Sequence, residues 1–214
     1  LVLASLLAGV AVGSVAIPFD EVLAALGGKT RGAASEIVWQ LRLPRVIAGF
    51  ACGGLLALAG ALLQVLLRNP LADPFVFGVS GGAALGVMLA MLLGLGAATQ
   101  GGFGLAGALA ASLLVLGMGL RTGNWNPYRL LLTGVVVAAG FNALLSLILV
   151  LAPQAAVKGM LFWLMGDLGY AEQPWPALVV LVLLLAACLP LAQAMNVLAL
   201  GREAVEQSGL ETFL

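Results

Sequence analysis

The sequence is poor in charge and contains no histidine. Charged residues make up 8% of its 214 residues, whereas an ordinary soluble domain has about 25%. So few charges cannot cover a soluble surface, which excludes a cytosolic enzyme, a nucleic-acid binder and a disordered protein. The missing histidine excludes every mechanism that needs an imidazole base or ligand. Acidic and basic residues number nine each, so net charge indicates neither an acidic nor a basic partner.

Cysteine is scarce as well. Cys52 and Cys188 both lie in apolar runs, which favours small buried side chains over a disulfide or a metal site. We expect neither a metal centre nor a resident cofactor.

Long apolar runs are what the sequence does contain. Hydrophobic residues make up 63% of it, and the charges bracket uncharged runs such as the 22 residues between Arg45 and Arg68. One helical span needs about 20 residues, and continuous rather than alternating apolar runs favour helices over a barrel. The prediction is an all-α polytopic transmembrane bundle. Its six spans lie at roughly 1–17, 46–67, 75–95, 103–120, 130–152 and 176–195.

Aromatic and small residues agree with this reading. All four Trp and both Tyr fall at predicted span ends or in loops, where an amphipathic ring prefers the headgroup level. Gly78, Gly82 and Gly86 repeat every four residues, which brings small residues to one helix face. We expect tight packing within one bundle rather than a dedicated dimer motif.

The ends and the orientation of the chain are weakly specified. The first span has a small-residue site at 14–16 that also suits a signal peptide, although no basic leader precedes it. No methionine occurs before Met88, so we expect the natural start to be missing. The predicted loops carry five basic residues on one side and four on the other, so charge bias gives no orientation.

Two short motifs match functional patterns but do not indicate those functions here. Residues 78–81 fit the GxSG pattern of an intramembrane serine protease, but that mechanism needs a histidine base. Residues 102–107 fit GxGxxG, but they enter a predicted span with no preceding strand, so they are no dinucleotide fingerprint. No Walker-type loop is present in the sequence. If the protein uses ATP, another subunit binds it.

Three loop segments are more informative. In LRLPR (41–45), Pro44 suits the first turn of a span. Arg42 and Arg45 could project together from the membrane surface. Anchoring of both side chains to lipid headgroups would equally explain their presence. In NPLADP (69–74), two prolines forbid a continuous helix, and Asp73 or Pro74 opens the next one. In the segment 196–210, charges begin directly after the last apolar run, as in any solvated juxtamembrane helix.

Together these segments resemble the permease subunit family of ATP-binding-cassette importers for cobalamin, iron-siderophores and haem. The resemblance runs from about Trp39 to the C-terminus. It rests on LRLPR followed by NPLADP and GVSGG (78–82), with RLLLTG (129–134) and FWLMG (162–166) in support. Family members have about ten spans, so this chain would match the first part of such a permease and is expected to be a fragment or a truncated product.

The resemblance also implies orientation and roles. The N-terminus would be cytoplasmic in a bacterial plasma (inner) membrane, and Arg42 and Arg45 would pair with acidic residues of an extracytoplasmic substrate-binding protein. Residues 158–169 would form a short extracytoplasmic helix. A cytoplasmic inner gate would include Asn69, Pro70 and Leu71. A cytoplasmic coupling segment at 196–214 would contact the ATPase subunit through Leu200, Gly201, Arg202, Glu203, Ala204 and Gly209.

The implied mechanism needs partners. Two permease chains would pair as a homodimer, substrate would pass between them, and a separate ATPase subunit would drive the gates. The chain itself would make and break no covalent bond. Gln64 and Asn142, polar residues inside spans, are candidates for the pathway lining, although helix–helix hydrogen bonds would also explain them. The alternative is a six-span channel or secondary carrier. All nine acidic residues fall outside the predicted spans, which disfavours an ion-coupled carrier.

Overall fold

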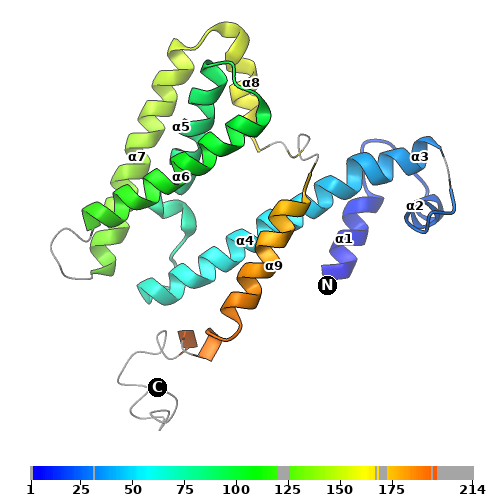
Figure 1. Cartoon of the computed structure of the whole chain (residues 1–214), viewed down its shortest axis with the longest axis horizontal. Coiled ribbons are helices and arrows are strands. Elements are labelled where there is room, and N and C mark those ends of the chain that lie inside the picture. The colour runs from blue at the N-terminus through cyan, green and yellow to red at the C-terminus, as the bar shows by residue number, and fades with distance from the viewer. Residues whose placement is uncertain are drawn as a thin grey trace. The chain divides into compact units, whose positions relative to one another are not determined.

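The computed structural model describes residues 2–30, 32–119, 126–166, 168, 173–193 and 195–196, and within these residues it is helical with no strand. The all-α fold class predicted from the sequence is confirmed. Figure 1 shows the elements, which in chain order are α1 (Val2–Ala11), α2 (Phe19–Leu26), α3 (Ala33–Glu36), the π-helix η1 (Ile37–Arg42), α4 (Leu43–Leu67), the 3-10 helix η2 (Pro74–Phe77), α5 (Val79–Leu92), α6 (Ala97–Gly119), α7 (Pro127–Leu151), α8 (Gln154–Leu164) and α9 (Trp175–Cys188).

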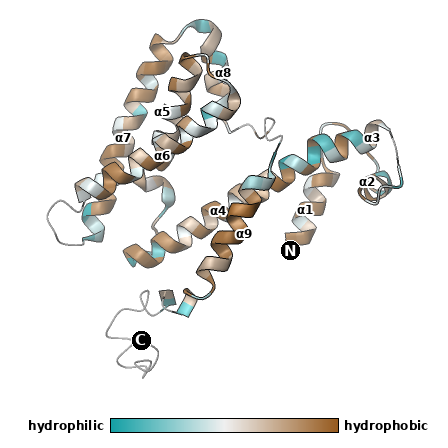
Figure 2. Cartoon of the chain, in the orientation of Figure 1, coloured by the Kyte–Doolittle hydropathy of each residue, from teal (hydrophilic) through white to brown (hydrophobic). Residues whose placement is uncertain are grey.

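Each of the six predicted spans overlaps one of these helices. Three helical stretches among the described residues are long and apolar enough to cross a membrane: Ala33–Leu67, α6 and α7. The helices α1, α5 and α9 are apolar but shorter, between 10 and 14 residues. Figure 2 shows hydrophobic residues along these helices. That all six segments cross the bilayer remains a prediction.

The helix that carries LRLPR begins earlier than Pro44 suggested. Pro44 is the second residue of α4, but α3 and η1 lead into α4 without a break. A proline within a helix lacks an N–H and presses on the carbonyl four residues earlier, here that of Gln40. The wider π turn of η1 accommodates the ring. At its end the Leu43 N–H donates to the Val38 carbonyl, five residues back.

Two other boundaries differ from expectation. Helix α1 ends at Ala11, well before residue 17, and a bend follows it at residues 13–15. The short helix expected at 158–169 is α8, which begins at Gln154, because Pro153 cannot continue α7 and instead precedes the new helix. The turn after α8 includes Gly166 at a φ of 79°, a left-handed conformation that suits glycine.

The chain forms two compact units. The N-terminal unit comprises Leu1–Leu58 with Asp167–Gln193, and the second unit comprises Ala59–Gly166 with Ala194–Leu214. In the N-terminal unit, a small core joins α1, α2 and η1 through Val10, Val22, Ala25 and Val38. In the second unit, α5 packs against α6 and α7. The buried residues of that bundle form two clusters, made of Leu67, Ala72, Phe77, Val115 and Leu130, and of Ala84, Met88, Leu145 and Met160.

Two glycines of α5, Gly82 and Gly86, face α6 within the same chain. A Cβ on Gly86 would lie 2.1 Å from the Phe103 carbonyl oxygen, and one on Gly82 would lie 2.4 Å from the Gly107 carbonyl oxygen. Conversely, a Cβ on Gly107 would lie 2.1 Å from the Gly82 carbonyl oxygen. These backbones lie close together because both helices carry glycines at the crossing. The prediction of packing within one bundle is confirmed for these glycines, and GxGxxG is part of a helix-packing surface.

The cysteines are less buried than expected. Both are free thiols, but Cys52 is exposed and Cys188 is half-buried. The prediction of buried side chains is wrong for Cys52 because α4 presents several apolar residues outward, including Phe50 and Leu56. In a membrane protein such a face meets lipid or another apolar surface.

Candidate functional site

The two arginines of LRLPR have different environments. Arg45 is exposed, whereas Arg42 is 8% exposed and is the buried charged side chain among the described residues. Arg42 Nη1 donates to the carbonyl oxygens of Val10 and Ala11, each at 2.9 Å, and its Nη2 donates to the carbonyl of Val15. The expectation that both side chains project together from the surface is therefore wrong for Arg42. A docking role for the pair stays a prediction.

A pocket of about 190 Å³ lies beside these arginines in the N-terminal unit. The bend after α1 and the start of α4 form its wall. Its lining residues are Gly9, Val12, Gly13, Ser14, Val15, Ile37, Leu41, Arg42, Arg45 and Val46. Both arginines thus border one pocket, Arg42 as a buried residue and Arg45 as an exposed one.

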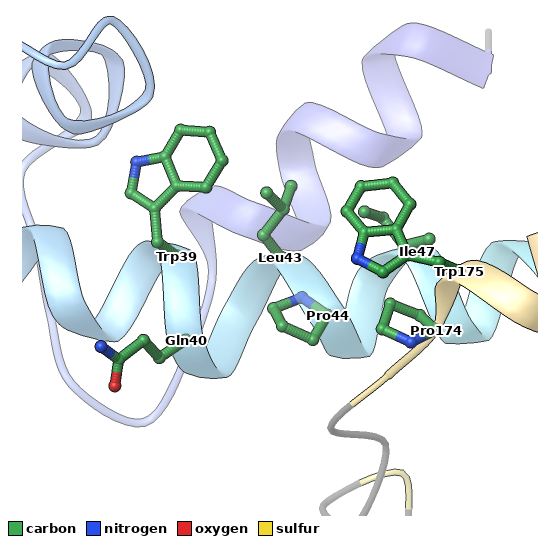
Figure 3. Close-up of a pocket in the computed structure, with 7 residues that line it drawn as sticks. All are labelled: Trp39, Gln40, Leu43, Pro44, Ile47, Pro174 and Trp175. Atoms are coloured by element: carbon green, nitrogen blue, oxygen red, sulfur yellow. The ribbon is translucent and has the colours of Figure 1, made fainter.

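A second pocket, of about 340 Å³, lies between η1, the start of α4 and the start of α9, all within the N-terminal unit. Figure 3 shows Pro44 and Pro174 side by side, with Trp175 over Ile47 and Trp39 further along the helix. Both indoles are about half exposed, and Trp39 Nε1 donates to the Ala25 carbonyl at 2.9 Å. Such a wall suits the headgroup level of a bilayer, where amphipathic rings gather.

The predicted gate turn is well ordered by local hydrogen bonds. Asn69 Oδ1 accepts from the Leu71 N–H at 2.9 Å, and the Asn69 carbonyl accepts from the Ala72 N–H at 3.0 Å. Leu71 is 86% exposed at the tip, next to the exposed Pro70. These Asx-type bonds make the turn a rigid unit with an apolar tip. Its role in gating stays a prediction.

The residues after this turn behave as predicted. Asp73 is the N-cap of η2, with its Oδ1 accepting from the Phe75 N–H at 2.7 Å, and Pro74 occupies the first position of that helix. Gly78 then takes a φ of 67° and starts α5, so the left-handed residue sets the angle between η2 and α5.

The two pathway candidates are found in different settings. Gln64 Nε2 lies 3.5 Å from the Ala72 carbonyl oxygen, so the side chain reaches the gate turn rather than another helix. The Asn142 side chain is exposed on α7, and its backbone carbonyl accepts from Ser146 Oγ at 2.9 Å. The coupling residues predicted at 200–209 lie outside the described residues.

Sequence reasoning missed two features, one local and one tertiary. Asn126 caps α7 by accepting from the N–H groups of Tyr128 and Arg129, with Pro127 at the first helical position. This repeats the arrangement of Asp73 and Pro74, so the Asx-Pro pair was the available signal. The acceptor site for Arg42 at the end of α1 had no comparable signal, because backbone carbonyls are not visible as a motif.

Known proteins resemble the whole of this chain. The FecCD transport family matches residues 1–214. Vitamin B12 import system permease protein BtuC of Escherichia coli O127:H6 is 38% identical over 178 residues, covering 81% of this chain and 54% of that protein. BtuC of Klebsiella pneumoniae is 35% identical over 219 residues, covering 100% of this chain and 63% of that protein.

A solved structure is similar as well. It is a metal-chelate type ABC transporter in an inward-facing conformation, with a TM-score of 0.76 and 25% sequence identity. The similarity covers 97% of this chain and 65% of that one. The chain thus spans between about half and two thirds of the length of the relatives that it matches. The resemblance to the permease subunits of ATP-binding-cassette importers is confirmed, and the chain belongs to the FecCD transport family.

Proposed function

We propose that this chain forms part of the membrane-embedded permease of an ATP-binding-cassette importer in the bacterial plasma membrane. The observation that carries the proposal is the family match over residues 1–214. The helical fold similar to a metal-chelate transporter over 97% of the chain supports it. A channel or secondary carrier has no comparable support. The chain would conduct substrate without covalent chemistry, and a separate ATPase subunit would supply the energy.

The substrate class follows from the relatives. Two relatives are named for vitamin B12 import, and the structural neighbour is a metal-chelate type transporter. Cobalamin, iron-siderophores and haem are all large metal chelates. We therefore infer a chelate of this class as cargo, moving between two copies of the permease arranged as a homodimer.

The docking surface in this proposal is the end of α4 that carries LRLPR. Arg45 is exposed there and presents a planar guanidinium to a carboxylate of the substrate-binding protein. Exposed charges of this kind fix docking register and steer the encounter more than they add affinity.

The gate proposal concerns the turn of Asn69, Pro70 and Leu71. Its internal hydrogen bonds and the link from Gln64 to Ala72 let it move as one body. A rigid turn that shifts between two positions is a suitable gate. Its exposed Leu71 would provide the apolar seal against its counterpart in the second permease chain.

The ATPase contact is the sharpest test of the proposed function. Arg202→Glu combined with deletion of residues 203–209 removes the predicted coupling segment and is expected to abolish co-purification of the ATPase subunit. Lys158→Glu is the matched charge reversal on the opposite predicted side, and it should leave the ATPase bound. If the altered protein retains the ATPase as well as the parent does, the coupling assignment is wrong.

A further inference from the structure

The short helix α2 (Phe19–Leu26) has an exposed apolar side and a charged side. We propose that α2 is an interfacial helix, which lies along the membrane surface with Phe19 and Leu23 inserted at the boundary between lipid headgroups and acyl chains. Trp39 holds it at that level. The proposal rests on the membrane embedding in the proposed function, but it involves neither the cargo nor the ATPase.

Three sides of α2 have different surroundings. Val22 and Ala25 are buried in the small core that α2 shares with α1 and η1. Phe19 and Leu23 are four residues apart, so they share one side of the helix, and they are 56% and 47% exposed. Glu21 is exposed and lies on the opposite side from Phe19, because two residues make about half a turn. A helix with a packed, an apolar and a charged side suits the meeting place of protein, lipid and water.

A hydrogen bond connects α2 to the helix that leads into α4. Trp39 Nε1 donates to the Ala25 carbonyl at 2.9 Å, near the end of α2, and the indole is itself 48% exposed. An indole has an apolar body and a polar N–H, and it prefers the headgroup level of a bilayer. Because this indole bonds directly to α2, the two lie at the same level.

The length of the helical stretch that contains Trp39 agrees with that level. The stretch Ala33–Leu67 has 35 residues, which at about 1.5 Å per residue is about 50 Å. The hydrocarbon core is about 30 Å thick, and the bilayer with its headgroups is about 40–45 Å thick. The stretch is therefore too long to lie wholly in hydrocarbon. With Leu67 at one surface, Trp39 lies about 40 Å away, in the headgroup region of the other.

The basic residue after α2 fits the same placement. Lys29 is exposed, and its backbone N–H donates to the Ala24 carbonyl at 2.8 Å in the turn that follows the helix. Gly28 makes that turn with a φ of 67°. A lysine at the headgroup level extends its ammonium group to lipid phosphates. The partner of α2 is therefore a lipid surface that contains anionic headgroups.

Electron paramagnetic resonance of nitroxide labels measures the depth of α2. In a background of Cys52→Ser and Cys188→Ser, single cysteines are introduced as Leu23→Cys and, as the matched control on the charged side of the same helix, Glu21→Cys. The labelled chain is reconstituted into liposomes of phosphatidylethanolamine and phosphatidylglycerol. Oxygen concentrates among acyl chains, whereas a water-soluble nickel chelate is excluded from them. The ratio of oxygen to nickel-chelate collisions is expected to be about threefold higher at position 23 than at position 21.

Two results would overturn the interfacial placement. One is an equal ratio at the two positions, which would leave both sides of α2 in water. The other is a label at position 23 that is shielded from both reagents, because a protein surface rather than lipid would then cover α2. Either result would leave the proposed function standing, since co-purification of the ATPase subunit does not depend on the depth of α2. The ratio at position 23 is equally independent of that co-purification.

The role of Trp39 is tested by a second pair of variants. Trp39→Phe keeps an aromatic ring but removes the N–H that donates to the Ala25 carbonyl. The collision ratio at position 23 is expected to fall by about twofold, because α2 loses its link to the helix that spans the membrane. Trp175→Phe changes the other indole of the neighbouring pocket, on α9, and should leave the ratio unchanged. An unchanged ratio in Trp39→Phe would refute the role of Trp39 in setting the level of α2.

Discussion

At the residue scale, two arginines three positions apart lie in different environments, one buried and one exposed. Arg42 and Arg45 are indistinguishable by composition or spacing, and both were predicted to lie at the surface. The carbonyls at the end of α1 hold Arg42 in a buried position, whereas Arg45 is exposed. The motif could not predict which of the two arginines is exposed, because backbone acceptors more than 25 residues away in the sequence decide it.

Reversal of the exposed charge tests the docking role. Arg45→Glu is expected to weaken capture of the loaded binding protein by about tenfold at low salt, because an exposed pair is replaced by repulsion. The effect should shrink in high salt, since screening reduces interactions between exposed charges. Affinity measured over a salt series checks this. An unchanged affinity at low salt would return Arg45 to an ordinary lipid anchor.

The cap at Asp73 gives a stability prediction. Asp73→Ala removes the acceptor for the Phe75 N–H and should cost about 1 kcal/mol of unfolding free energy. Asp73→Asn keeps an acceptor oxygen and should cost less. Denaturant unfolding of the purified protein in detergent compares the two variants. Equal losses would show that the carboxylate charge, rather than the cap, matters here.

At the element scale, α5 and α6 are joined by backbone contact. Gly86→Leu places a side chain where the Phe103 carbonyl oxygen already lies and is expected to cost about 1–3 kcal/mol or more, because the helices must separate. Gly101→Leu on α6 meets nothing within 4 Å and is the matched control. The midpoint of thermal unfolding in detergent should fall for the first variant only. Equal midpoints would contradict the tight crossing.

The existence of the helices was easier to predict than their boundaries. The uncharged runs, with the longest of them divided at the Gly-rich stretch 94–104, located the six apolar helices that overlap the predicted spans. The boundaries depended on smaller effects, such as the π turn before Pro44 and the restart of the chain after Pro153. A run of apolar residues predicts where a helix forms. It does not predict at which proline or capping residue that helix begins or ends. For α1, a side chain from another helix takes part in ending it.

The candidate site follows the same division. The Asx-Pro pattern correctly predicted the N-cap at Asp73, because all of its bonds are local in sequence. The packing of Gly82 and Gly86 was also predictable from spacing, although the partner helix was not. By contrast, the contact from Gln64 to Ala72 and the burial of Arg42 are tertiary and had no local signal.

At the scale of the whole molecule, the proposed docking and coupling contacts lie on opposite faces of the membrane. The proposed docking residue Arg45 would face outward, and the predicted coupling segment at 200–209 would face the cytoplasm. This arrangement follows from the proposed function, because an importer would take substrate from a binding partner outside and would be driven by an ATPase inside. The proposed docking and coupling contacts both depend on that orientation.

Sided cysteine labelling tests the orientation most directly. In a background of Cys52→Ser and Cys188→Ser, single cysteines are introduced as Arg45→Cys and Ser208→Cys. A membrane-impermeant maleimide added to intact spheroplasts is expected to label position 45, and position 208 only after the membrane is opened. Labelling of both positions in intact spheroplasts would contradict the proposed orientation, because it would place residues 45 and 208 on the same side of the membrane.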